Sequence, residues 1–255
     1  MPYAVNGGIR IHYQVEGDGP PLLLHHGFTE SLEGWREFGY VDALKDDYRL
    51  ILLDARGHGA SDKPHDPAAY EMALRARDVV AVLDELGIER AHYLGYSMGG
   101  RIGFDTAKLA PERLRSLMIG GSHPYAVDGR AVYGPMFRDG LEAFLERQPL
   151  PEDVRTPSFD ARILGNDLEA LVAASGDRPS VEEILPTLPM PCLIYLGEAD
   201  PAYPQAENWV RRIPTATFVA LAGLDHWAGY YRSDLVLPHV RAFLERVGQH
   251  QGPVA

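Results

Sequence analysis

The sequence predicts an α/β domain in which helices cover a mostly parallel sheet. Six short apolar runs recur along the 255 residues without polar alternation. Such runs are typical of strands that are buried on both faces of a parallel sheet. Stretches with helical spacing lie between the runs, and this alternation favours right-handed crossovers and a parallel sheet.

The first strand that we expect differs from the six buried runs. Ile9, Ile11, Tyr13 and Val15 alternate with polar residues, the period-two pattern of a half-buried strand. We expect this strand to lie antiparallel at one edge of the sheet. The buried runs follow it at residues 22–24, 50–53, 91–96, 114–119, 192–196 and 217–221.

Helical periodicity separates the predicted strands. Met72, Ala76, Val79 and further apolar residues up to Leu86 recur at three- and four-residue intervals, and Gly87 suits the position just after a helix. Residues 102–109 and 237–247 have a similar pattern.

This alternation stops between residues 122 and 189, where prolines and scattered helical signals occur without a strand run. A structureless loop of that length is uncommon in a compact domain. We therefore predict a helical cap at 122–189, called the cap segment below, inserted into a core formed by 1–121 and 190–255. Its position places it over the edge where open α/β sheets bind ligands.

Composition limits the function. The net charge of −12 argues against binding to nucleic acid or to an anionic membrane surface. Cys192 is the single cysteine, which excludes an intrachain disulfide and a cysteine-rich zinc site. The N-terminal residues lack a signal-peptide pattern and no apolar stretch is long enough to span a membrane, so we expect a cytoplasmic protein. The sequence gives no indication of the oligomeric state.

The segment Gly95-Tyr96-Ser97-Met98-Gly99-Gly100 follows a buried run and precedes a helical stretch. Strand, G-x-S-x-G and helix in this order predict a nucleophile elbow, which exposes the serine hydroxyl at the edge of the sheet. Glycine at 95 and 99 removes side chains that would collide in so sharp a turn. The backbone N–H of Met98 would then be one donor of an oxyanion hole.

Another apolar run ends in His25-His26-Gly27-Phe28. We interpret this turn as the source of a second oxyanion donor, the backbone N–H of Phe28, with His26 bracing the loop by hydrogen bonds. A metal site on His25 and His26 is the competing interpretation. Neighbouring residues of a strand point to opposite faces, which argues against that site.

The general base and the acid that orients it are expected after later strands. His226 follows the last buried run and would lie at the same sheet edge as Ser97, where it could accept the serine proton near neutral pH. Asp200 follows the preceding run and would orient His226. Glu198 and Asp225 are the alternatives for this acid.

The order Ser97, Asp200, His226 together with His26-Gly27 resembles the α/β-hydrolase superfamily over nearly the whole chain, in its serine carboxylesterase-like branch. Residues 54–61 are similar to its D-x-R-G-x-G-x-S loop, in which Asp54 and Arg56 would brace the loop. The resemblance implies an eight-stranded sheet and a helical cap between strands six and seven. Ser97 excludes the chemistry of relatives that carry aspartate at the elbow.

These observations predict a serine hydrolase that cleaves carboxylic esters of short-to-medium acyl chain through an acyl-enzyme, without metal or cofactor. A lactonase or a carbon–carbon bond hydrolase with the same triad is the alternative, because the elbow sequence does not separate these activities. A non-catalytic ligand-binding receptor on this fold is a further alternative. Apart from Arg101, no Lys or Arg adjoins the motifs, so a strongly anionic substrate is not predicted. We expect the substrate to contact Phe28, Trp35, Tyr96, Met98, Tyr125, Phe137, Tyr203 and Trp227.

Overall fold

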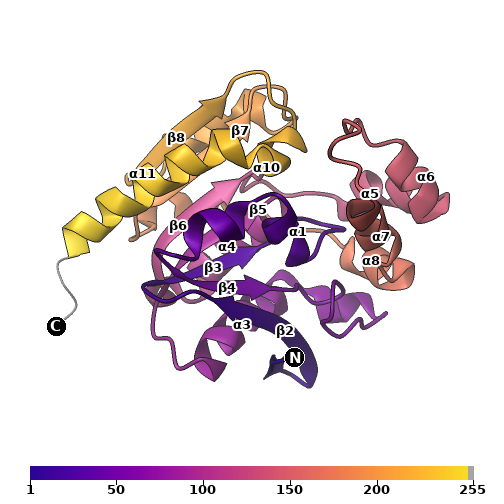
Figure 1. Cartoon of the computed structure of the whole chain (residues 1–255), viewed down its shortest axis with the longest axis horizontal. Coiled ribbons are helices and arrows are strands. Elements are labelled where there is room, and N and C mark those ends of the chain that lie inside the picture. The colour runs from indigo at the N-terminus through magenta and orange to yellow at the C-terminus, as the bar shows by residue number, and fades with distance from the viewer. Residues whose placement is uncertain (252–255) are drawn as a thin grey trace.

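The structure is a computed structural model that describes residues 1–251. Its centre is one eight-stranded sheet with the strand order β1-β2-β4-β3-β5-β6-β7-β8 (Figure 1). The six strands from β3 to β8 are parallel, whereas β2 is antiparallel to β4 and β1 is antiparallel to β2. The predicted mostly parallel sheet is therefore confirmed. The strands are β1 (Tyr3–Asn6), β2 (Ile9–Glu16), β3 (Pro21–His25), β4 (Arg49–Leu53), β5 (Ala91–Tyr96), β6 (Leu114–Gly120), β7 (Cys192–Gly197) and β8 (Ala216–Leu221).

The N-terminal edge differs from the sequence pattern, which indicated one strand there. The structure has a hairpin of β1 and β2, joined by Gly7 and Gly8. Both glycines have positive φ, which suits the tight turn of a two-residue hairpin. With four residues, β1 is too short to show a period-two pattern of its own.

Helices cover both faces of the sheet. On one face lie α3 (Met72–Glu85), α4 (Met98–Leu109) and α9 (Ala206–Val210), and on the other lie α1 (Glu33–Glu37), α2 (Tyr40–Leu44) and α11 (Ser233–Gln251). Successive strand residues enter opposite apolar cores: Leu23 packs with α3 and α4, and Leu22 packs with α2 and α11. Both faces therefore need apolar side chains, which explains the unbroken runs in the sequence. The short helices outside these two layers include η1 (Pro67–Tyr70), η2 (Pro111–Arg113), η4 (Tyr203–Gln205) and α10 (Ala228–Tyr231), and η3 (Glu182–Thr187) lies near the end of the cap segment.

The chain between β6 and β7 holds four α-helices that gather at one end of the sheet (Figure 1). They are α5 (Gly129–Phe137), α6 (Gly140–Glu146), α7 (Pro157–Leu164) and α8 (Leu168–Ala174). These helices share an apolar cluster that includes Phe144, Phe159 and Leu171. The domain boundaries at 121/122 and 189/190 stay a prediction from the sequence.

Polar contacts attach the cap segment to the loop after β3. Nε of Arg162 in α7 lies 2.8 Å from Oε2 of Glu30, and both side chains are buried. The Asn166 side chain donates to the backbone carbonyl of Thr29 at 2.7 Å. The cap segment therefore braces the loop in which the second oxyanion donor is expected.

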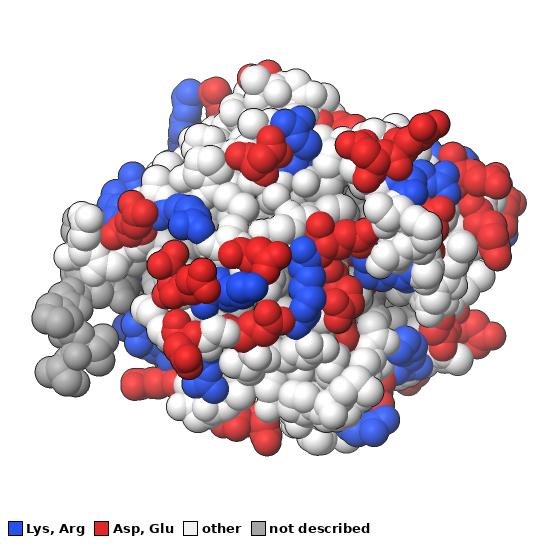
Figure 2. Space-filling view, viewed as in Figure 1, with Lys and Arg blue, Asp and Glu red and all other residues white. Residues whose placement is uncertain are grey.

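Charges alternate in sign on the face of the molecule shown in Figure 2, where basic side chains lie among acidic ones. Exposed side chains of opposite charge also pair on the surface of the protein, for example Arg232 with Asp234 and Arg241 with Asp47. Within residues 1–251, no helix is both long enough and apolar enough to span a membrane.

Candidate active site

Ser97 occupies a sharp turn between β5 and α4. Its backbone has φ 51° and ψ −108°, and positive φ is uncommon for residues other than glycine. A β-carbon at Gly95 would lie 2.4 Å from the carbonyl oxygen of Gly99, and one at Gly99 would lie 2.1 Å from that of His25. The turn therefore requires glycine at both positions, as the sequence indicated.

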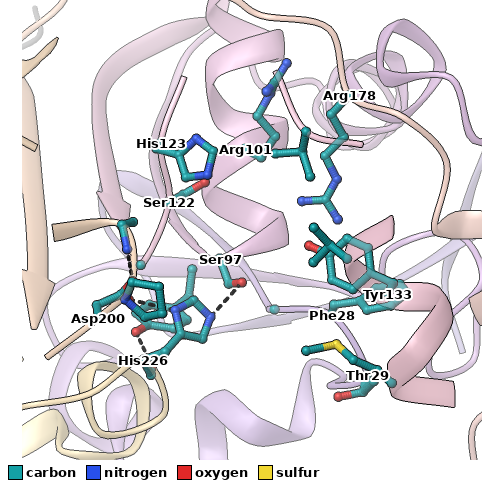
Figure 3. A pocket seen from close by; sticks show the side chains of 18 of the residues that line it. Phe28, Thr29, Ser97, Arg101, Ser122, His123, Tyr133, Arg178, Asp200 and His226 are labelled. Carbon is teal, nitrogen blue, oxygen red and sulfur yellow. Dashed lines mark hydrogen bonds and ion pairs between the residues drawn. The ribbon is translucent and has the colours of Figure 1, made fainter. Parts of the chain in front are cut away.

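The structure brings Ser97, His226 and Asp200 together (Figure 3). Nε2 of His226 lies 3.0 Å from Oγ of Ser97, and Nδ1 of His226 lies 2.7 Å from Oδ2 of Asp200. His226 comes from the loop after β8 and Asp200 from the loop after β7, at the edge of the sheet where β5 ends. When Nδ1–H donates to the carboxylate, Nε2 is left to accept the serine proton.

Asp200 is 3% exposed, and its other carboxylate oxygen accepts the Ala202 N–H at 2.8 Å. Burial by itself raises the pKa of the Asp200 carboxyl, but the hydrogen bond and charge of His226 and the Ala202 amide together hold that pKa below its usual value. The carboxylate is therefore ionised at neutral pH, the form that can orient the imidazole and stabilise its cation.

The two alternative acids have other contacts. Oδ1 of Asp225 accepts the Ala228 N–H at 2.7 Å and so caps α10. Glu198 is exposed, and its carboxylate accepts the Gly223 N–H at 3.4 Å. Of the three candidates, Asp200 is the carboxylate that contacts His226.

The two proposed oxyanion donors belong to adjacent segments. A β-carbon at Gly27 would lie 3.5 Å from Cβ of Ser97, so the loop that contains Phe28 passes directly beside the serine. In the part of the chain that the structure describes, neither the Phe28 N–H nor the Met98 N–H donates to another backbone group. Both N–H groups are therefore free of backbone partners at this edge of the site.

Backbone strain occurs beside both donors. Within the described residues, Thr29 (φ 68°) and Ser97 are the residues other than glycine that have positive φ. Thr29 follows Phe28, and Ser97 precedes Met98. Such strain persists only where the surrounding structure holds it, and it concentrates at functional sites.

The two neighbouring histidines after β3 have separate structural partners. Nε2 of His26 accepts the Ala55 N–H at 3.1 Å, and its Nδ1 lies 2.7 Å from the Gly27 carbonyl oxygen. Nδ1 of His25 instead contacts the Tyr93 hydroxyl at 2.7 Å. His26 therefore braces the loop, as expected from the sequence.

The loop after β4 is held by a buried hydrogen bond between two side chains and by a buried ion pair. Asp54 contacts Nδ1 of His12 at 2.7 Å and also accepts two backbone N–H groups. Arg56 pairs with Asp78 of α3, with Nη2 and Oδ1 2.5 Å apart. These contacts agree with the bracing roles expected for Asp54 and Arg56.

A cavity of about 740 Å³ opens beside Ser97, between the core loops and helices α5 and α6 of the cap segment. Most of its wall is apolar or aromatic. Five of the residues that we expected to contact the substrate line this cavity: Phe28, Tyr96, Tyr125, Phe137 and Trp227.

Three other residues that were expected to contact substrate are absent from the cavity wall. Trp35 is fully buried and packs edge-on against Tyr40 and Tyr230, because α1 turns its apolar side toward the sheet. The Met98 side chain is buried, and Tyr203 stacks on Phe218 of β8. None of these three side chains therefore lines the cavity beside Ser97.

The sequence analysis missed several other residues of the cavity wall, among them His123 and Arg178. Both belong to the cap segment, which has no motif that assigns a direction to its side chains. Burial, together with the nearby charges of Arg101 and Arg178, lowers the pKa of His123.

Comparison with known proteins agrees with this geometry. The sequence model of the family described as the alpha/beta hydrolase fold matches residues 20–234. The chain belongs to this family. This α/β-hydrolase is 30% identical to a 2-hydroxy-6-oxononadienedioate/2-hydroxy-6-oxononatrienedioate hydrolase of Pseudomonas sp., with 95% of this chain and 93% of that protein covered.

Among solved structures, this α/β-hydrolase resembles esterase RhEst1 from Rhodococcus sp. ECU1013, with a TM-score of 0.83 and 26% identity over 96% of this chain and 98% of the esterase. It also resembles the enol-lactonase from Burkholderia xenovorans LB400, with a TM-score of 0.82 and 26% identity over 96% of this chain and all of the lactonase. These relatives support a hydrolase activity.

Proposed function

We propose that this α/β-hydrolase cleaves carboxylic esters of short-to-medium acyl chain by two-step acyl transfer through Ser97. The observation that carries the proposal is the chain of contacts from Ser97 through His226 to a buried, ionised Asp200 at the wall of the cavity. This arrangement activates a hydroxyl group that is a weak nucleophile on its own.

In the first step, Oγ of Ser97 attacks the ester carbonyl carbon while Nε2 of His226 accepts the hydroxyl proton. The N–H groups of Phe28 and Met98 stabilise the negative oxygen of the tetrahedral intermediate, each contributing about 3–4 kcal/mol in comparable sites. His226 then donates its proton to the departing alcohol. In the second step, His226 deprotonates a water molecule, which attacks the acyl-enzyme. The bond between the acyl carbon and Oγ of Ser97 then breaks, His226 returns the proton to Oγ, and the acid is released.

The test combines a covalent label with turnover. We expect a fluorophosphonate probe to label Ser97 and the protein to hydrolyse p-nitrophenyl esters of short-to-medium acyl chain. Ser97→Ala should abolish both reactions while leaving the thermal melt nearly unchanged. Ser122→Ala is the matched control, because Ser122 lines the same cavity without a histidine partner in the described residues. Label that persists in Ser97→Ala would refute the proposal.

A lactonase or carbon–carbon bond hydrolase remains the second candidate, because the relatives above include an enol-lactonase and a hydrolase of dioate substrates. All three reactions would use the same nucleophile and base. Turnover of a simple ester, a lactone and a vinylogous diketone by the same preparation separates them.

A further inference from the structure

Two arginine side chains, Arg101 and Arg178, line the cavity. Arg101 has protein hydrogen-bond partners for its guanidinium. Nε of Arg101 donates to Asp105 at 2.8 Å, its Nη1 donates to the Tyr125 carbonyl at 3.0 Å, and its Nη2 donates to the Pro179 carbonyl. Arg101 therefore has a carboxylate that balances its charge, and it ties α4 to the cap segment.

The second arginine, Arg178, has no such partner. Its side chain is 7% exposed, and its Nε and Nη2 atoms are buried without a hydrogen-bond partner. Among the described residues, no carboxylate forms an ion pair with it. Within the described residues, the Arg178 guanidinium packs against one aromatic ring, that of Tyr133. The centroid of this ring lies 4.9 Å from Cζ of Arg178.

The backbone fixes the direction of this side chain. Arg178 and Val127 exchange two backbone hydrogen bonds of 2.9 Å in an isolated antiparallel bridge. From this bridge the Arg178 side chain extends into the cavity toward Tyr133 (Figure 3). The fold therefore holds an unpaired guanidinium against the space that substrate would occupy.

A buried cation without a partner is unfavourable, because burial removes its hydration and nothing in the protein replaces it. An anion bound in the cavity would supply the missing partner. The planar guanidinium matches the two oxygens of a carboxylate. Asp105 already balances Arg101, so Arg178 is the arginine of this wall that has no carboxylate partner among the described residues. One unpaired guanidinium suits a single carboxylate in a mostly apolar wall.

We infer that the substrate carries a carboxylate that pairs with Arg178, an inference that rests on the proposed ester hydrolysis at Ser97. In Figure 3, His226 and Arg178 lie on opposite sides of Ser97. His226 protonates the departing alcohol, so the acyl chain extends toward the opposite side, where Arg178 lies. The substrate class is therefore the monoester of a dicarboxylic acid, with its free carboxylate at the far end of the acyl chain.

The test compares two phenyl esters of matched shape, monophenyl adipate and phenyl 6-methylheptanoate, in which an isopropyl group replaces the carboxylate. Hydrolysis of each ester is measured by the release of phenol. The readout is the ratio of kcat/KM for the anionic ester to kcat/KM for the neutral ester. Loss of a charge-assisted hydrogen bond should lower this ratio by about 10- to 100-fold in Arg178→Met. Arg130→Met is the control, because Arg130 is an exposed residue of α5 outside this cavity, and it should leave the ratio unchanged.

The outcomes separate this inference from the proposed function. If the wild-type protein hydrolyses neither ester, the proposed function fails. If it hydrolyses both esters and Arg178→Met leaves the ratio unchanged, the inference about the carboxylate is overturned.

Inhibition of the wild-type protein gives a measurement that needs no variant. Adipate should inhibit hydrolysis of phenyl 6-methylheptanoate at a concentration at least about 10-fold lower than uncharged adipamide, because one of its carboxylates would pair with Arg178. Equal inhibition by the two compounds would overturn the inference even if Arg178→Met fails to fold.

Discussion

The backbone N–H of Gly99 donates a hydrogen bond of 3.1 Å to the carbonyl oxygen of His26. This bond ties the turn after β5 to the loop after β3, the two segments that contain Met98 and Phe28. The contact depends on the absence of a side chain, because a β-carbon at position 99 would lie 2.1 Å from the His25 carbonyl oxygen. The spacing of the two proposed oxyanion donors therefore depends on one glycine.

Gly99→Ala is expected to separate these segments. The clash is with backbone, so the strand and the turn must move apart, at a cost of about 1–3 kcal/mol for an overpacked position. That cost corresponds to a melting temperature lower by about 2–12 °C for a domain of this size. Because a misplacement of about 1 Å can cost about 100-fold, we also expect kcat to fall by about that factor.

Gly134→Ala is the control for this prediction. Gly134 lies within α5, and a β-carbon there would have no neighbour within 4 Å. Alanine favours a helix more than glycine does, so this variant should melt at or slightly above the wild-type temperature. Equal melting temperatures and equal kcat for Gly99→Ala and the wild type would contradict the role given to Gly99.

Asp200→Asn tests which acid orients His226. Asparagine keeps the shape of the side chain but removes the charge that stabilises the imidazolium, so we expect kcat for ester hydrolysis to fall by about 10⁴-fold. Asp225→Asn should keep kcat within a few-fold, because its side chain can still accept the Ala228 N–H. If Asp225→Asn lost as much activity as Asp200→Asn, the assignment of Asp200 would be wrong.

The strands and the elbow could be predicted because each depends on local sequence. A strand buried on both faces needs a continuous apolar run, as at Cys192–Gly197, and the turn at Ser97 needs small neighbours. The order of the loops along the chain then brings His226 and Asp200 to one edge of the sheet. None of these inferences requires knowledge of how the cap segment folds.

The wall of the cavity could not be predicted in the same way. An aromatic residue after a strand can face either the cavity or the core, and the packing of α1 against the sheet sends Trp35 to the core. Arg178 is remote in sequence from every motif, and only its bridge to Val127 aims it into the cavity. Such positions depend on tertiary contacts that leave no periodic pattern in the sequence.

The buried histidines His26 and His58 should make the protein less stable against unfolding in acid. Burial, with a further contribution from the nearby His26, lowers the pKa of His58 to about 3. Between about pH 6.5 and pH 3 the unfolded chain binds a proton at this residue and the folded protein does not. The free energy of unfolding should therefore decrease as the pH falls below 6.5, by about 1.4 kcal/mol per pH unit from His58.

Urea unfolding at pH 7, 6 and 5 measures this dependence. His58→Gln should be less stable at pH 7, because it disturbs a fully buried site, but its stability should fall less steeply between pH 6 and pH 5. The expected difference in slope is about 1.4 kcal/mol per pH unit. If the free energy of unfolding decreased equally with falling pH in the wild type and in His58→Gln, His58 would not be held in its neutral form by the fold.

Replacement by methionine should affect thermal stability differently at the two arginines of the cavity wall. Arg101→Met leaves the carboxylate of Asp105 without its partner in a largely buried position, a loss that typically costs about 3–5 kcal/mol. Arg178→Met removes a buried cation that has no carboxylate partner among the described residues, and it replaces that cation with an apolar side chain in an aromatic wall. The ligand-free Arg178→Met protein should therefore melt no lower than the wild type, whereas Arg101→Met melts well below it. Thermal melts without ligand check this contrast, and a loss of several kcal/mol in Arg178→Met would mean that Arg178 supports the fold rather than a bound anion.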